Sequence, residues 1–485
     1  MPFTLKTPLL LSFLCLSLFA NGQLVKGLNY LAESTSGFST GEQTPFWLLS
    51  NRQGLSSLSK NNSYLRVALF RPAEQNKRFT YSYGLDLAAA THYTSSFIVQ
   101  QAYLDLHYQV LALSIGSKER WGEMKNQQLS SGGLTYSGNA RPIPQIRIGF
   151  PEFVSVPYTH GWFQVRGHIA YGIFTDDNWQ KDFVATGQKH TEQVLYHSKA
   201  LFWRIGKEHV SPFLYEGGLE MSAQFGGNSY SGSSKIDMPN HPLDFLRVFI
   251  PSGGDKSTPL GEQTNIYGNH LGSWHSSLAY TRDEWKVRAY FEHYFEDHSM
   301  MFWEYGWKDG LVGVELTLPK QMMVQQIVLE YMTSRDQAGP VYNDTNDVIP
   351  EQISATDNYY NHGIYTGWQH WGMSIGSPLM LSPLYNKDGS ITFKNNRLES
   401  YHLGFSGSLT REVSYRVLYT RTKSWGTYSN PASEVLSDTY LLWEMNYQPR
   451  QLKGWKFTAS LGTDRGDMTG YNNGLLFTIR KTGQL

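Results

Sequence analysis

The chain has 485 residues, and its 41 Lys and Arg balance 41 Asp and Glu, so its formal net charge is zero. A neutral chain lacks the basic excess of a nucleic-acid binder and the acidic excess typical of many disordered chains. The mean hydropathy of −0.41 excludes a bundle of transmembrane helices. Aromatic residues are abundant at 14%, and the length allows several ordinary domains or one large barrel.

Residues 1–22 predict a secretory signal peptide. Lys6 precedes the apolar run 9–19, and Ala20-Asn21-Gly22 places small residues at the cleavage positions. An uncleaved membrane anchor is the alternative, but the run is shorter than the ~20 residues that span a bilayer. Cys15 is the only cysteine and lies in this signal. The mature chain is therefore expected to have no disulfide and no cysteine-based metal site.

Residues 23–62 show poor alternation. Leu31–Ser34 and Pro45–Arg52 are compatible with helical fragments. We therefore expect residues 23–62 to form a short N-terminal helical or plug segment, at or in the periplasmic mouth of the domain formed by residues 63–485.

From residue 63 onward, polar and apolar side chains alternate in segments of about ten residues, which is the period of a β-strand. In 81–93, for example, Leu85 and Leu87 share one face, and Asp86 lies on the other. About 18 such segments occur, and single-chain bacterial barrels have an even number of strands. They are residues 63–71, 79–93, 98–108, 110–117, 143–149, 162–174, 199–206, 214–226, 274–282, 285–296, 310–319, 324–333, 364–376, 398–409, 412–423, 436–448, 454–464 and 472–481.

Two architectures produce this alternation: a soluble β-domain with its apolar face inward, and an outer-membrane barrel with its apolar face toward lipid. Aromatic residues at the ends of apolar faces, such as Tyr81 and Tyr108, suit an interfacial girdle. Charges near strand centres, such as Asp86 and Glu292, suit a polar lumen. We predict an all-β, transmembrane, antiparallel barrel of about 18 strands over residues 63–485, with long extracellular and lumen-folded loops.

Signals for catalysis are weak. His293–His298 contains two histidines, but their spacing on a strand is not that of a zinc-binding helix. Paired carboxylates for glycoside hydrolysis could be drawn from Glu292, Glu296, Asp297, Glu304 and Asp309, yet a polar lumen carries carboxylates without catalysis. We expect no catalytic residue, no metal and no cofactor.

The loops combine aromatic side chains with polar partners, which is the chemistry that binds sugars. The alternative is that these aromatic residues belong to the girdle or pack the loops. As candidate polysaccharide-binding residues we select Trp274, Glu296, Asp297, Trp303, Trp307, Tyr359, Tyr360, Asn361, Trp368, His370 and Trp371.

Several short motifs, in order along the chain, resemble the Wzi-type capsule-assembly outer-membrane proteins. They are Thr44–Gly54, Leu129–Leu134, Asn139–Ile148, Gly268–Trp274, Phe295–Ser299, Asp309–Leu311, Tyr359–Asn361 and Asn395–Arg397. The resemblance implies an 18-stranded barrel with an occluded pore and a helical segment at the periplasmic end. It also implies a non-enzymatic, lectin-like role in a Gram-negative cell, in which exported polysaccharide is bound and attached or assembled at the surface.

From these observations we expect a monomer in the outer membrane whose partners are surface polysaccharide (capsule or exopolysaccharide) and outer-membrane lipid, with polysaccharide export machinery as a further candidate. Two other functions stay open: a porin or channel, and a membrane-embedded enzyme that modifies glycan or lipid.

Overall fold

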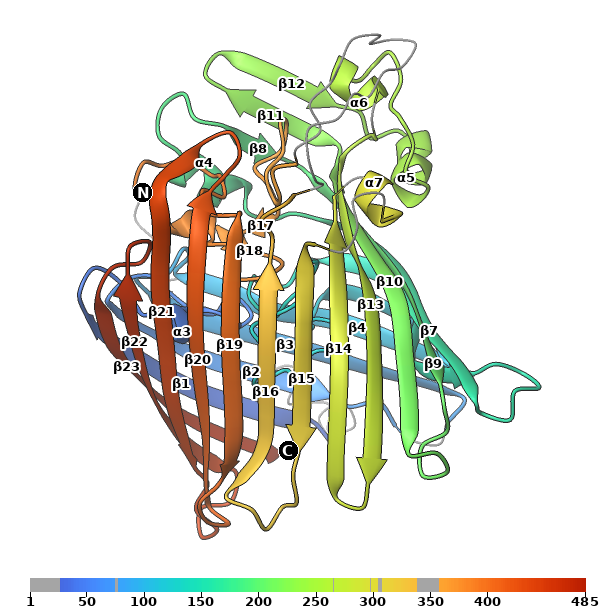
Figure 1. Ribbon diagram of the computed structural model, residues 1–485, viewed down its shortest axis with the longest axis vertical. Helices are drawn as coiled ribbons and strands as arrows, with labels where there is room; N and C mark the ends of the chain where they lie inside the picture. The colour runs from blue at the N-terminus through green and yellow to red at the C-terminus, as the bar shows by residue number, and fades with distance from the viewer. Residues whose placement is uncertain (1–26, 75–76, 265, 297, 304–307, 338–356) are drawn as a thin grey trace.

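The protein is a closed antiparallel β-barrel of 18 strands (Figure 1). The computed structural model describes residues 27–74, 77–264, 266–296, 298–303, 308–337 and 357–485, so the expected signal peptide lies outside the described residues. β1 pairs with β23, with Asn29 opposite Gln484, and this pairing closes the barrel. The predicted all-β barrel of about 18 strands is therefore confirmed.

In order around the barrel, the strands are β1 (Asn29–Thr40), β2 (Asn61–Arg71), β3 (Phe79–Thr91), β4 (Phe97–Tyr108), β5 (Leu111–Ser117), β6 (Gln145–Ser155), β7 (Phe163–Ile173), β9 (Leu195–Ile205), β10 (Phe213–Phe225), β13 (Asn269–Arg282), β14 (Trp285–Phe295), β15 (Gly310–Thr317), β16 (Val324–Thr333), β19 (Leu398–Ser408), β20 (Val413–Gly426), β21 (Pro431–Tyr447), β22 (Trp455–Gly466) and β23 (Asn472–Gln484). Every neighbouring pair is antiparallel, as the short connections at one end require.

The barrel wall carries apolar side chains outward and charged side chains inward. On β3, Leu85 is 47% exposed, whereas the next residue, Asp86, is fully buried. Asp86 forms an ion pair in the lumen with Arg66 of β2. Val67, the next residue after Arg66, is 60% exposed on the outer face. Such a large outward apolar surface is expected to face lipid rather than water. The orientation predicted from the alternation is confirmed.

Short turns and long loops lie at opposite ends of the barrel. The turns 109–110 and 283–284 are at the bottom of Figure 1, where β1 also begins and β23 ends. The long connections 118–144, 226–268 and 334–397 start from the top. Outer-membrane barrels have short periplasmic turns and long extracellular loops, so the bottom is the periplasmic end.

Three loops fold back into the lumen, and we call them the plug: residues 41–60, 118–144 and 357–397. Phe46 of α3 (Phe46–Leu49) stacks on Tyr440 of β21 with ring centroids 4.2 Å apart. Trp368 donates from Nε1 to the carbonyl of Thr135 at 2.8 Å and so joins two of the loops. The plug contributes many members of one large buried apolar cluster inside the barrel.

The short plug elements are β17 (Gln369–His370), β18 (Met373–Ser374) and the 3-10 turn Pro383–Tyr385. The position of α3 differs from the expectation. The Phe46 backbone N–H donates to Asp464, two residues from the extracellular end of β22, so α3 lies in the outer half of the lumen and not at the periplasmic mouth.

A cap covers the extracellular end above the plug (Figure 1). It contains a small sheet and short helices: α4 (Asp177–Phe183), β8 (His190–Glu192), β11 (Gly227–Ser231), β12 (Ser234–Met238), α5 (Pro242–Phe249), α6 (Leu260–Thr264) and α7 (His298–Met301). Within the described ranges, none of these or the other helices is long and apolar enough to span a bilayer.

Candidate functional site

The plug is held by carboxylates that project inward from the barrel wall. Glu330 on β16 accepts hydrogen bonds from the Ser130 hydroxyl at 2.6 Å and from the Ser131 backbone N–H at 2.7 Å. Glu292 on β14 accepts from the Leu134 backbone N–H at 2.7 Å. Hydrogen bonds to a buried carboxylate compensate its desolvation. These strand-centre charges therefore bind protein loops and do not merely solvate a water-filled lumen.

Glu292 also belongs to a buried cluster with Glu220 and His275, whose ligand atoms lie within 4.8 Å of one another. Two carboxylates and an imidazole are chemically suitable metal ligands. Lys125, however, places its ammonium 2.7 Å from Glu292, and His275 is 2.9 Å from Glu220. The Lys125 ammonium already neutralises Glu292, so the cluster is an ion-pair network. A metal ion could bind here only by displacing the Lys125 ammonium.

Four of the sequence-selected residues are buried in the plug. Tyr359, Tyr360 and Trp368 have no exposed surface, and His370 is 1% exposed. The Tyr360 hydroxyl donates to the Leu134 carbonyl and accepts from the Ser377 backbone N–H at 2.8 Å. These side chains form the core of the plug, and a polymer outside the barrel does not reach them while the plug is in place.

Trp274 and Trp303 lie on the outward face of the wall. Trp274 has the same strand parity as the lipid-facing Leu278, and its Nε1 donates to the Met301 carbonyl at 2.9 Å. Trp303 is 40% exposed and stacks on His293 with ring centroids 3.8 Å apart. Trp274 is near the extracellular end of β13 and Trp303 packs on the extracellular end of β14, and both positions suit the aromatic girdle of an outer-membrane barrel.

The remaining selected residues are dispersed. Asn361 is bound to the backbone of Phe393, and Trp371 lies 4.4 Å from the Arg141 guanidinium. Glu296 accepts from the Tyr360 backbone N–H at 2.6 Å. Asp297 and Trp307 lie outside the described residues. The structure therefore does not bring the selected residues together into one surface site.

A different surface in the cap does combine aromatic and polar side chains. One face of the three-stranded sheet carries six residues in register across β8, β11 and β12, and we call it the cap-sheet face. They are His190, Glu192, Asn228, Tyr230, Lys235 and Asp237. All six are half-buried or exposed.

The cap-sheet face is flat and charged. Tyr230 stacks on His190, with ring centroids 5.0 Å apart and 10° between the planes. The Lys235 ammonium lies 5.8 Å from the Tyr230 ring, and Lys181 of α4 forms an ion pair with Glu192 at 2.8 Å. An aromatic plane surrounded by donors and acceptors can bind the C–H face and the hydroxyls of a sugar at the same time.

The opposite face of the same sheet packs on the plug. Thr191 and Ser229 are buried; the Ser229 hydroxyl donates to the Ile364 carbonyl at 2.6 Å, and Thr191 lies 3.2 Å from the Thr366 hydroxyl. The plug thereby fixes which face of the sheet is turned outward. The cap-sheet face was not among the sequence-selected residues, although the alternation of 227–238 around Gly232 is a hairpin signal.

The fold and the outward apolar band define an outer-membrane β-barrel whose lumen contains its own loops. No protein-family model matches the chain, and no curated protein matches it either. Among solved structures it is similar to Escherichia coli Wzi, described as an outer membrane protein involved in group 1 capsule assembly and a carbohydrate-binding β-barrel. That similarity has a TM-score of 0.56 at 14% identity and covers 100% of this chain and 90% of Wzi.

Two further similar structures are Pseudomonas aeruginosa OccD3 and OprD. OccD3 has a TM-score of 0.43 at 10% identity and covers 95% of this chain and 92% of its own. OprD has a TM-score of 0.44 at 9% identity and covers 95% of each chain. At these levels of similarity the Wzi match supports the barrel fold, and the two weaker matches add nothing to the functional argument.

Proposed function

We propose that this protein is a non-enzymatic, lectin-like outer-membrane barrel that binds exported surface polysaccharide and helps to attach or assemble it at the cell surface. The observation that carries the proposal is the cap-sheet face, an extracellular surface on which Tyr230 and His190 are ringed by charged and amide side chains. Its neighbours belong to the cap, above the membrane, where a polymer outside the cell meets the protein.

The plug supports the same proposal. A diffusion channel needs a continuous water-filled lumen, whereas the plug places a large apolar cluster across this barrel. The carboxylates nearest the plug, Glu292 and Glu330, are bound to plug backbone or hydroxyl groups. A catalytic carboxylate must reach substrate, so these contacts favour binding over turnover. The carbohydrate-binding description of Wzi, the similar structure, agrees with this assignment.

The test is glycan-array binding of the purified full-length protein, comparing wild type with Tyr230→Ala. Loss of one aromatic sugar contact, worth about 0.5–1.5 kcal/mol, should weaken binding by about twofold to tenfold. Tyr471→Ala is the matched control, because Tyr471 is exposed in the extracellular connection between β22 and β23 and lies outside the cap sheet.

Equal weakening by Tyr230→Ala and Tyr471→Ala would show that the cap-sheet face is not the binding surface. Consumption of any bound glycan by the wild-type protein would reject the non-enzymatic assignment.

A further inference from the structure

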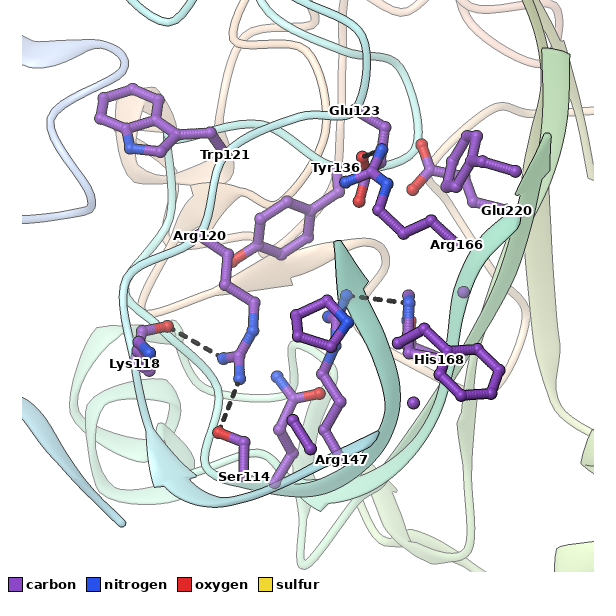
Figure 2. A pocket seen from close by; sticks show the side chains of 18 of the residues that line it. Ser114, Lys118, Arg120, Trp121, Glu123, Tyr136, Arg147, Arg166, His168 and Glu220 are labelled. Carbon is purple, nitrogen blue, oxygen red and sulfur yellow. Dashed lines mark hydrogen bonds and ion pairs between the residues drawn. The ribbon is translucent and has the colours of Figure 1, made fainter. Parts of the chain in front are cut away.

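A polar cavity lies between the plug loop 118–144 and the barrel wall (Figure 2). Its volume is about 440 Å³, within the range of small-molecule sites. The lining runs from plug residues 120–125 and Tyr136 down to His107 and Ala112, which are close to the short turn 109–110. A ligand of this cavity therefore comes from the periplasm, at the end of the barrel opposite the cap-sheet face.

The cavity carries an excess of positive charge. Five cationic side chains and three carboxylates line it: Lys118, Arg120, Lys125, Arg147 and Arg166 against Asp105, Glu123 and Glu220. The carboxylates are already paired, as Asp105 contacts Lys118 at 2.6 Å, Glu123 contacts Arg166 at 2.7 Å and Glu220 contacts His275 at 2.9 Å. Lys125 in turn contacts Glu292. Arg120 and Arg147 remain, and neither forms an ion pair with any residue that the structure describes.

Both arginines are held in place by neutral acceptors. Arg120 donates to the Lys118 carbonyl at 3.1 Å and to the Ser114 hydroxyl at 3.2 Å. Arg147 donates to Nδ1 of His168 at 2.8 Å. Since that nitrogen accepts, His168 is neutral and its Nε2–H donates to the Ser198 hydroxyl. The two guanidinium groups are thus oriented without losing their charge.

Aromatic side chains share the cavity with these charges. Tyr136, Trp121 and Phe202 contribute to the lining, and Figure 2 shows Arg120, Arg147 and Tyr136 grouped around the same space. A guanidinium matches a carboxylate with two parallel hydrogen bonds, and an aromatic face packs against the C–H face of a sugar ring. An acidic saccharide offers both features at once.

We propose that this cavity is a second, periplasm-facing site that binds acidic saccharide units, with Arg120 and Arg147 as the carboxylate-binding residues. The choice of a saccharide rests on the proposed function, whereas the oxyanion chemistry rests on the two arginines alone. The site would contact an acidic polymer, or its repeat units, before export is complete.

The experiment is isothermal titration of the full-length protein in detergent with three probes: a trimer of galacturonate, an uncharged trimer of galactose and inorganic phosphate. We expect the acidic trimer to bind and the uncharged trimer not to bind. The double variant Arg120→Gln/Arg147→Gln should weaken binding of the acidic trimer at least tenfold. The affinity of Arg120→Lys/Arg147→Lys for the acidic trimer should lie between those of wild type and the glutamine double variant, because lysine keeps the charge but cannot donate two parallel hydrogen bonds.

Arg204→Gln is the matched control, since Arg204 also points into the lumen but is paired with Glu216 and lines a separate cavity. Its affinity for the acidic trimer should equal that of wild type. Heat-modifiable migration in gel electrophoresis, which depends on no glycan, should show that each variant is a folded barrel, and it keeps this test separate from that of the proposed function.

Three results would overturn the proposal: no binding of the acidic trimer, equal binding to wild type and the glutamine double variant, or equal binding of the uncharged trimer. Binding of phosphate without the acidic trimer would identify the cavity as a phosphate site and reject the saccharide assignment.

Discussion

At the scale of single residues, the same side-chain chemistry suits two different uses, sugar binding and the packing of a buried loop. Tyr359, Tyr360 and Trp368 have the aromatic-plus-polar surroundings expected of sugar contacts, yet they form the core of the plug. A loop that folds into a barrel needs large apolar side chains to pack and hydroxyl or indole N–H groups to satisfy buried backbone. Composition alone could not separate these uses, so the sequence identified aromatic-rich loops but could not tell that Tyr359, Tyr360 and Trp368 are buried inside the plug.

Tyr360→Phe should loosen the plug without opening the barrel wall. Removal of the hydroxyl leaves the Leu134 carbonyl and the Ser377 N–H buried without this partner, at a cost of about 1–3 kcal/mol. Hydrogen–deuterium exchange at Ser377 should become faster, while exchange in the wall strands stays unchanged. Tyr415→Phe is the control, because its hydroxyl bonds the Met323 carbonyl at an exposed site. Unchanged exchange at Ser377 would contradict the bridging role of Tyr360.

Asp309 should make the attachment of residues 336–337 and 359 to the end of the barrel wall sensitive to pH. Burial is the largest influence on its carboxyl and raises the pKa from 3.8 to about 6, although N–H groups of Asp336 and Gln337 and the Tyr359 hydroxyl oppose the rise. At about 1.4 kcal/mol per pKa unit, this rise corresponds to about 3 kcal/mol. Because the folded-state pKa of Asp309 lies above the unfolded value, the contribution of its protonated carboxyl to stability is fully present below about pH 4. This contribution is lost as the pH rises through about 6.

The measurement is protection of the Gln337 and Tyr359 amides from exchange between pH 4.5 and 7.5, corrected for intrinsic rates. Protection in wild type should fall across this window. Asp309→Asn cannot ionise and should show no such fall. A wild-type profile parallel to that of the variant would rule out ionisation of Asp309 as the cause.

At the scale of elements, the predicted number of strands is correct because two errors cancel. Residues 29–40 form β1 but were expected to be helical or irregular, because outward positions such as Ala32, Ser34 and Ser36 are small and give no apolar alternation. Residues 364–376 were expected to be a wall strand but lie in the plug. There Ile364, Trp368 and Ile375 pack against protein, so the local pattern resembles that of a strand facing lipid.

The cap sheet illustrates what local sequence does predict. The hairpin of β11 and β12 turns at Gly232, whose φ of +57° favours glycine. Along its strands, Ser229 and Ile236 lie on one face, and the residues beside them, such as Tyr230 and Lys235, lie on the other. What sequence could not supply is the pairing of β11 with β8, which joins Tyr230 to His190, 40 positions apart along the chain. The candidate site depends on that long-range pairing, and so it emerged only from the structure.

At the scale of the whole molecule, the plug lies between the two proposed sites, which differ chemically: the cap-sheet face outside and the arginine cavity, whose lining reaches toward the periplasmic turns. The plug joins the two sites physically, since residues 364–366 support the cap sheet and residues 120–125 line the cavity. This arrangement suits a protein that holds polymer on one or both sides of the membrane without passing it through its own lumen.

Conductance in a planar bilayer tests that arrangement. Wild-type protein should be nearly silent, because the plug packs apolar side chains across the lumen. Replacement of residues 126–137 with a short Gly-Ser linker removes the contacts of Ser130, Ser131 and Leu134 with Glu330 and Glu292, and it should produce steady open steps. A linker of the same length in place of residues 427–430, an extracellular connection outside the plug, should stay silent. Steady open steps from the wild-type protein would instead identify a channel, and the plug would then be a selectivity element of a pore.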